Sequence, residues 1–185
     1  MIVDMYFELV RNAFDDEFCD FIFSKLKGQI FEKAHVNIYG KQTDLQNVRN
    51  NLRLEFNDQT VADKIKNKIS LLTRFPVELN GKSFKFPSAL FRSYLYELGQ
   101  YFKPHKDGSE TINEMQSQIT CLIYLNDTYG GETVLMPNGF ADKSTHIKIE
   151  PKKGSMLLFE HKFWHEGLPV HTGEKYVLRT NLMYL

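Results

Sequence analysis

The sequence has few cysteines, no long apolar run and no basic leader. Only Cys19 and Cys121 occur among the 185 residues. Each lies in an apolar helix-like or strand-like segment, so we interpret both as small buried side chains in a reducing compartment. No stretch approaches the roughly 20 apolar residues that cross a bilayer. Because residues 1–10 lack a basic region before an apolar run, we expect no secretory signal and a cytoplasmic protein with no membrane partner.

The chain also lacks an excess of charge of either sign. Lys+Arg and Asp+Glu number 23 each, so the formal net charge is zero. Nucleic-acid-binding proteins usually carry a basic balance or a basic stripe, and we therefore expect no nucleic-acid partner. Hydrophobic residues make up 42% of the chain, which is ordinary for a globular protein. A chain of this length can bury a substantial core, and we predict a single domain over residues 1–185.

Two predicted helices precede a long series of predicted strands. Apolar residues recur at helical spacing after Asp15 and again after Thr60, where Thr60 and Asp63 resemble a capping box and Pro76 is expected to end the helix. Asn80-Gly81 marks a hairpin turn. Residues 108–116 form a polar loop, a candidate lid over a site. We expect further strands near residues 89–98, 101–106, 117–126, 132–137, 145–150, 155–160 and 175–184.

This order of elements predicts an α+β, mainly β protein. Helices followed by many short strands are typical of a two-sheet barrel with helices against one face, and the jelly roll, or double-stranded β-helix, is its usual form. We assign the supporting helices and strands to residues 1–88 and the jelly-roll core to residues 89–185.

The segment YLYELGQYFKPHKD, residues 94–107, ends in a His-x-Asp pair. Alternate side chains of an extended strand face the same side, so His105 and Asp107 can ligate one ion. A third imidazole from a distant segment would complete one face of an octahedron and leave three positions open, as in non-haem Fe(II) oxygenases. The segment FWHEGLPVHTGEKYVLR offers His165, and His161 lies four residues earlier as a competing ligand.

Two cations lie just beyond His165 on a predicted strand. Lys175 and Arg179 share one face of that strand, and either could anchor a dicarboxylate through a charge-assisted hydrogen bond. Lysine offers a compact ammonium, whereas the planar fork of arginine pairs with a carboxylate in two places. The residues alone leave open which of the two is the anchor.

Three segments together resemble the iron(II)/2-oxoglutarate-dependent dioxygenases, in particular their prolyl 4-hydroxylase-like branch. They are YELGQYFKPHKD (96–107), YLNDTYGGETVLMP (124–137) and residues 151–184, in the family's order. The resemblance implies a jelly-roll fold. The frame H-x-G-x-P-V-x-x-G-x-K favours His165 over His161. The site residues that the resemblance implies are the metal ligands His105, Asp107 and His165, and the 2-oxoglutarate-binding residues Lys175, Tyr96 and Thr133, with Arg179 as the alternative anchor.

The same resemblance implies an oxygenase activity. Such an enzyme needs Fe(II), 2-oxoglutarate and O2, with ascorbate as a reductant, and it hydroxylates an unactivated C–H bond with release of succinate and CO2. The favoured substrate is a prolyl or other residue of a peptide or protein. One alternative is the same chemistry on a free amino acid or small-molecule natural product, and another is a non-catalytic, cupin-like metal-binding protein.

Overall fold

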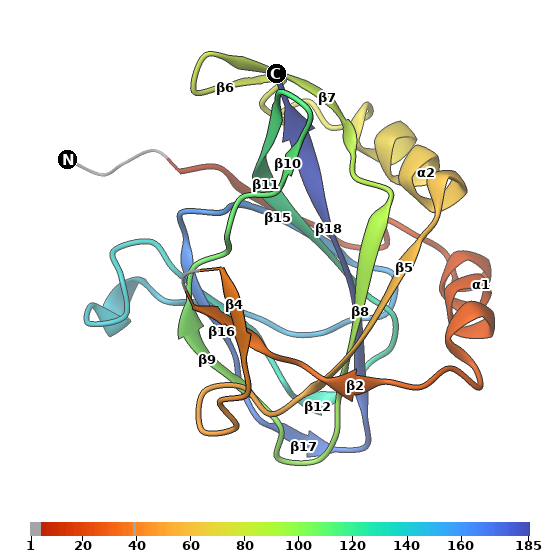
Figure 1. Cartoon of the computed structure of the whole chain (residues 1–185), viewed down its shortest axis with the longest axis vertical. Coiled ribbons are helices and arrows are strands. Elements are labelled where there is room, and N and C mark those ends of the chain that lie inside the picture. The colour runs from red at the N-terminus through yellow and green to blue at the C-terminus, as the bar shows by residue number, and fades with distance from the viewer. Residues whose placement is uncertain (1–4, 39) are drawn as a thin grey trace.

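Two stacked sheets and two helices build the protein, as predicted from the sequence. The computed structural model describes residues 5–38 and 40–185. The main sheet has the strand order β1-β15-β11-β18-β8-β5-β2, and the smaller sheet has the order β14-β13-β16-β9. Both helices lie against the face of the main sheet that is turned away from β9 and β16 (Figure 1). This double-stranded β-helix confirms the predicted fold class.

The elements of the N-terminal half support the main sheet. Strands β1, β5 and β7 pair directly with β15, β8 and β18, so this half extends the sheet of the C-terminal half. The elements are β1 (Phe7–Val10), α1 (Asp16–Leu26), β2 (Glu32–Lys33), β3 (Val36–Ile38), β4 (Lys41–Thr43), β5 (Leu52–Asn57), α2 (Gln59–Ile69), β6 (Glu78–Leu79) and β7 (Lys82–Pro87).

The C-terminal half supplies most of both sheets. Its elements are β8 (Leu90–Tyr96), β9 (Phe102–His105), β10 (Thr111–Ile112), β11 (Met115–Tyr124), β12 (Tyr129–Gly130), β13 (Thr133–Met136), a short 3-10 helix (Lys143–Thr145), β14 (Ile147–Ile149), β15 (Met156–Glu160), β16 (Trp164–Gly167), β17 (Val170–Thr172) and β18 (Lys175–Tyr184).

The main sheet buries both of its faces, because side chains alternate along each strand. On β11, Cys121 and Ile123 point into the core shared with the helices, whereas Leu122 and Tyr124 point into the core between the two sheets. Both faces are apolar, so these strands are near-continuous hydrophobic runs. The inter-sheet core is the layer in which the candidate site residues lie.

Helix boundaries match the sequence predictions at the first helix and differ at the second. Asp15 caps α1 by accepting a hydrogen bond from the backbone N–H of Phe18. The second helix is capped by Asp58, which accepts from Val61, so the predicted start at Thr60 was wrong. This helix ends at Ile69 and not at Pro76. Aspartate is at least as strong an N-cap as threonine. The capping-box pattern therefore placed the start of the helix too late, at residue 60.

Two other local expectations are corrected, and one is confirmed. The polar segment 108–116, expected to be a loop, contains β10, which pairs with β11 in a hairpin. Strands β16 and β17 were not predicted, because a histidine-rich, glycine-containing segment lacks the apolar alternation of a strand. The Asn80-Gly81 hairpin was correctly placed between β6 and β7, with both turn residues at positive φ.

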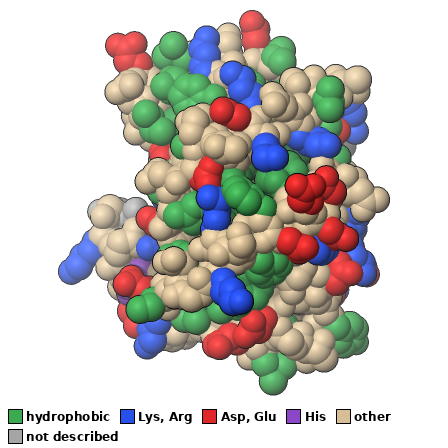
Figure 2. Space-filling model, turned by 90° about the vertical axis from the view of Figure 1, so that its right-hand side faces the viewer, with side chains coloured by type: hydrophobic (Ala, Val, Ile, Leu, Met, Phe, Trp, Pro, Cys, Tyr) green, Lys and Arg blue, Asp and Glu red, His purple; other side chains and the backbone are tan. Residues whose placement is uncertain are grey.

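Acidic and basic side chains lie interspersed over the face that carries the helices (Figure 2). This distribution agrees with the balanced composition of the chain. Within the described residues, the helices are too short and too polar to cross a bilayer.

Gly154 makes the tightest glycine contact of the fold, and we expect Gly154→Ala to lower the free energy of unfolding by at least about 2 kcal/mol. Its φ is +73°, and an added Cβ would lie 2.1 Å from the carbonyl oxygen of Phe14. Gly28→Ala is the matched control, because its φ is +75° but an added Cβ would contact nothing within 4 Å. Urea denaturation measures both, and equal losses would contradict the close approach of Phe14.

Candidate metal centre

Three of the predicted site residues meet at one point. One nitrogen each of His105 and His165 and one carboxylate oxygen of Asp107 all lie within 4.8 Å of one another. His105 ends β9, Asp107 follows it, and His165 lies on β16 directly across from His105 in the antiparallel pair. The two imidazole rings are 4.1 Å apart between centroids. Adjacent strands of the smaller sheet therefore bring together residues sixty positions apart in the chain.

The two imidazoles are oriented by the backbone. Nδ1 of His105 donates to the carbonyl oxygen of Lys103 (2.8 Å), and Nδ1 of His165 donates to that of Phe163 (3.1 Å). A carbonyl oxygen can only accept, so each ring carries its proton on Nδ1 and keeps a lone pair on Nε2. The ring of His105 also stacks on Phe102, with centroids 3.5 Å apart. Metal-binding histidines usually have this second hydrogen bond.

Burial and charge set the protonation states that a metal ion requires. Burial lowers the pKa of His165, and burial with the neighbouring His165 lowers the pKa of His105 well below its ordinary value. Burial alone would raise the pKa of Asp107, but Arg179 and the two imidazoles hold it well below its usual range. At neutral pH the site therefore offers two neutral imidazoles and one carboxylate, which is the donor set of a facial triad.

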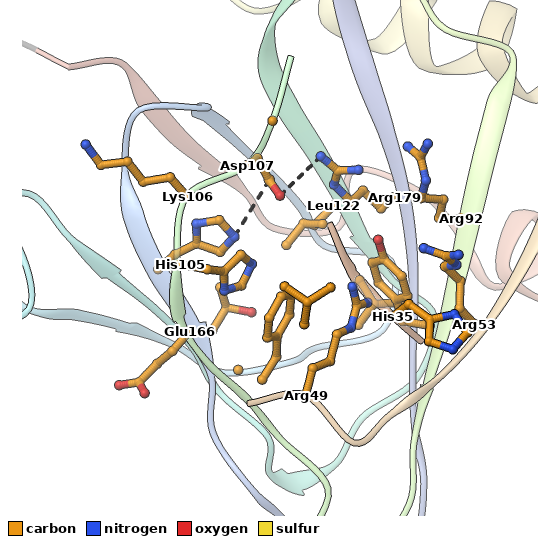
Figure 3. Close-up of a pocket in the computed structure, with 18 of the residues that line it drawn as sticks. His35, Arg49, Arg53, Arg92, His105, Lys106, Asp107, Leu122, Glu166 and Arg179 are labelled. Carbon is orange, nitrogen blue, oxygen red and sulfur yellow. Dashed lines mark ion pairs between the residues drawn. The ribbon is translucent and has the colours of Figure 1, made fainter. Parts of the chain in front are cut away.

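Asp107 is held from two sides. Thr120 donates its hydroxyl to Oδ2 at 2.5 Å, and Nη2 of Arg179 lies 3.2 Å from Oδ1. Figure 3 marks the ion pair between Asp107 and Arg179 and the 3.7 Å approach of Oδ2 of Asp107 to Nε2 of the neutral His165. Arg179, which the sequence suggested as a possible anchor for a dicarboxylate, is thus engaged with the carboxylate of the candidate metal site.

Lys175 lies at the deep end of the same cavity. Its side chain is 2% exposed, and its ammonium donates to the carbonyl oxygen of Gly131 at 2.6 Å. The Nζ atom also lies over the rings of Tyr96 (4.9 Å) and Tyr124 (5.7 Å). Burial lowers the pKa of this amine to about 7. A buried amine with one carbonyl partner leaves two donor positions for a carboxylate.

The other two predicted 2-oxoglutarate-binding residues line the same cavity as Lys175. Tyr96 on β8 is directly opposite Lys175 in the strand register, and Thr133 on β13 is buried. The hydroxyl of Tyr124 donates to Oγ1 of Thr133 at 2.8 Å. The sequence analysis did not single out Tyr124, although it opens the YLNDTYGGET motif. Its position on a long apolar strand gave no sign that its hydroxyl would meet Thr133.

His161, the competing third ligand, lies outside the triad. It is buried, and neither ring nitrogen has a hydrogen-bond partner among the residues described. Burial lowers its pKa to about 4. His161 belongs to the turn after β15, whereas His165 lies on β16 and joins the other two ligands. The helical spacing that made His161 a candidate does not apply, because residues 161–165 form a turn and the start of β16.

The candidate metal ligands and the predicted 2-oxoglutarate-binding residues line one cavity of about 520 Å³. His105, Asp107, His165 and Thr133 lie on its walls together with Lys175. Figure 3 shows that arginine side chains gather on the side of the cavity opposite His105. They are Arg49, Arg53 and Arg92.

Comparison with known proteins agrees with this geometry. The family model described as the 2OG-Fe(II) oxygenase superfamily matches residues 90–183. A protein named probable prolyl 4-hydroxylase 11 from Arabidopsis thaliana is 35% identical over 100 residues, which cover 54% of this chain and 32% of that protein. An uncharacterized fowlpox virus protein is 32% identical over 84 residues, 45% of this chain and 18% of that one. The chain thus spans about a third or less of the curated relatives it matches.

Solved structures are similar over nearly the whole chain. The collagen prolyl hydroxylase of Paramecium bursaria Chlorella virus-1, in a 2-oxoglutarate complex, has a TM-score of 0.66 and 24% identity, covering 99% of this chain and 98% of that one. A Trichoplax adhaerens prolyl hydroxylase, in complex with a peptide of hypoxia inducible factor, has a TM-score of 0.73 and 17% identity, with 95% and 82% coverage. These structures share the jelly-roll fold. By its sequence match over residues 90–183, the chain belongs to the 2OG-Fe(II) oxygenase superfamily.

Proposed function

We propose that the protein is an Fe(II)- and 2-oxoglutarate-dependent hydroxylase of the prolyl hydroxylase type. One observation carries this proposal. Two neutral imidazoles and a carboxylate converge within 4.8 Å on the wall of the cavity that also contains the buried cation Lys175. A site that only stored metal would not need a buried amine beside it. The donor set fits Fe(II), which favours two His and one carboxylate with open positions.

In this proposal His105, Asp107 and His165 hold the metal ion. The carbonyl oxygens of Lys103 and Phe163 keep the Nε2 lone pairs available. Arg179 and Thr120 orient the carboxylate and keep it ionised. Arg179 is thereby a positioning residue for the carboxylate of Asp107.

Lys175 is proposed as the anchor for the distal carboxylate of 2-oxoglutarate. The hydroxyls of Tyr96 and Thr133 add neutral donors beside it. Arg179 is the less suitable anchor because its guanidinium is already paired with Asp107 at 3.2 Å. A buried ammonium facing a carboxylate forms a hydrogen bond about twice as strong as a neutral one.

Fe(II), 2-oxoglutarate and O2 together supply the oxidant that replaces hydrogen by hydroxyl at an unactivated carbon, leaving succinate and CO2. The chain's own residues bind the co-substrate, orient it and exclude water from the buried cavity. Ascorbate as the reductant remains a prediction. The β10–β11 hairpin borders the cavity through Ser109 and Glu110, where the sequence suggested a lid.

We expect the affinity for 2-oxoglutarate to fall as the pH rises above about 7. Burial lowers the pKa of Lys175 to about 7 in the free protein, and a bound carboxylate would raise it again. Binding therefore takes up a proton, and each further pH unit should weaken binding by up to about tenfold. Calorimetric titration with Mn(II) present measures this. Lys175→Met should remove the dependence, and an affinity that stays constant between about pH 6 and 9 would contradict it.

The proposed substrate is a prolyl or other residue of a peptide or protein. The plant relative and the two solved structures, all named as prolyl hydroxylases, support this choice. A free amino acid or other small molecule is the alternative substrate for the same chemistry. Incubation with Fe(II), 2-oxoglutarate and proline-containing peptides tests the proposal. The proposal is supported if succinate forms and the peptide gains the mass of one oxygen atom. It is contradicted if no succinate forms, whether or not a peptide is added.

A further inference from the structure

Arg49 is a buried cation without a fixed anion. Its side chain is 5% exposed and lines the cavity. Nη2 is buried and has no hydrogen-bond partner within the described part of the chain, and Arg49 forms no ion pair there. An arginine stays protonated at any physiological pH. A buried, unpaired charge costs several kcal/mol, so its retention at this position points to an anion that binds there.

The guanidinium is held rigidly. Nε of Arg49 donates to Oδ1 of Asn51 at 2.8 Å, and the group lies 4.6 Å from the ring centroid of Tyr94 and 4.3 Å from that of Phe102. Its segment is tied to β9, because the backbone N–H of Lys103 donates to the carbonyl of residue 48 at 2.9 Å. A donor fixed in advance loses little entropy when it binds a ligand.

Two other arginines of the cavity already have an acidic partner. Arg53 and Arg92 both contact Oε1 of Glu55, at 3.4 and 3.0 Å, so one carboxylate is shared by two guanidinium groups. Among the remaining acidic residues of the lining, Glu110 accepts a hydrogen bond from Asn181 at 2.8 Å. Figure 3 shows Glu166 pointing away from the arginine cluster. This wall of the cavity therefore has positive charge in excess.

We propose that the substrate carries a carboxylate near the carbon that is hydroxylated, and that Arg49 binds this carboxylate. The inference rests on the proposed function. The carboxylate can be an acidic side chain adjacent to the target residue of a polypeptide, or the α-carboxylate of a free amino acid. In either case Arg49 and the half-neutralised pair Arg53 and Arg92 discriminate acidic from neutral substrates.

The co-substrate is a less suitable partner for Arg49. Lys175 lies between Tyr96 and Tyr124 and faces the carbonyl of Gly131. Arg49 instead stacks on Tyr94 and Phe102. The two cations thus have separate neighbours in one cavity. If Arg49 bound 2-oxoglutarate, its removal would raise the KM for that compound, which the test below measures.

The test compares acid and amide partners that differ in one group. The pairs are N-acetylproline with N-acetylprolinamide, blocked Ala-Pro-Asp with Ala-Pro-Asn, and blocked Asp-Pro-Ala with Asn-Pro-Ala. Binding is measured by calorimetry with Mn(II) and 2-oxoglutarate present, which needs no turnover. We expect the acid of at least one pair to bind about tenfold or more tightly than its amide. The first pair reports a small-molecule substrate, and the other two report a polypeptide.

Three variants assign the preference to Arg49. Arg49→Gln should reduce the acid-to-amide ratio of affinities to within about twofold, while the KM for 2-oxoglutarate stays unchanged. Arg49→Lys should keep part of this ratio, because lysine keeps the positive charge but lacks the planar fork of arginine. Arg11→Gln is the matched control, because the exposed Arg11 only contacts the carbonyl of Glu150. It should keep the full ratio. Thermal melting confirms that each variant folds. If Arg49→Gln does not fold, the acid-to-amide ratio of Arg49→Lys tests the role of Arg49.

Several outcomes would overturn the inference. They are a ratio near one for all pairs in the unmodified protein, binding of no acidic probe, a ratio that Arg49→Gln leaves intact, and a raised KM for 2-oxoglutarate in that variant. Failure of the proposed function would be recognised by a different result. In that case the unmodified protein would form no succinate from 2-oxoglutarate, whereas the calorimetric ratios would still report on Arg49.

Discussion

Replacing His165 with alanine is expected to abolish tight Fe(II) binding and to lower 2-oxoglutarate turnover more than about 100-fold. Loss of a group that merely orients a ligand already costs 10–100-fold in such sites, and His165 supplies one of the three converging donors. His165→Ala is preferable to a change at Asp107. Removal of that carboxylate would leave Arg179 buried without its ion-pair partner and could unfold the protein.

Two matched histidine variants sharpen this test. His171→Ala makes the same change at an exposed residue of β17 and should leave metal binding unaltered. His161→Ala removes the competing ligand, which lies outside the cluster of three. Fe(II) binding is followed by calorimetry under anaerobic conditions, and succinate by chromatography. Metal loss in His161→Ala with retention in His165→Ala would reverse the assignment of the third ligand.

Lys175→Ala should raise the KM for 2-oxoglutarate by about 100-fold or more while Fe(II) still binds. The ammonium is 2% exposed, so its loss would leave the distal carboxylate of the co-substrate buried beside neutral hydroxyls. A buried charge deprived of its partner costs about 3–5 kcal/mol, and each 1.4 kcal/mol is a factor of ten. Initial rates at varied 2-oxoglutarate concentration measure the change.

Arg179→Lys separates the two possible anchors. It keeps a positive charge near Asp107 but cannot reproduce the guanidinium geometry seen at 3.2 Å. If Lys175 is the anchor, this variant should change metal affinity and leave the KM for 2-oxoglutarate within about threefold. An unchanged KM in Lys175→Ala, together with a raised KM in Arg179→Lys, would transfer the anchoring role to Arg179.

The fold class could be predicted from local patterns, whereas the convergence of three site residues needed a local pattern together with a family resemblance. Strand alternation places His105 and Asp107 at one strand end. The pairing of β16 with β9 then brings in His165, and this pairing followed only from resemblance to a family. Lys175 and Tyr96 were expected to bind the same carboxylate of 2-oxoglutarate. They lie opposite each other in the register of β18 and β8.

Other features depend on tertiary contacts that no local pattern reports. Arg49 lies shortly before β5, and only its burial against Tyr94 and Phe102 distinguishes it from a surface arginine. The pairing of Arg179 with Asp107 could not be deduced either. The position of a residue on a strand specifies the direction of its side chain but not the group that the side chain contacts. The β10–β11 hairpin turns at Asn113, a single residue at positive φ in a polar segment.

A crystal structure with Mn(II) in place of Fe(II) and with 2-oxoglutarate tests the central proposal most directly. Anomalous scattering locates the metal. We expect one ion bonded to Nε2 of His105, Nε2 of His165 and an oxygen of Asp107, with the far carboxylate of 2-oxoglutarate against Nζ of Lys175. An ion held elsewhere, or a co-substrate whose far carboxylate meets Arg179 or no cation, would contradict it.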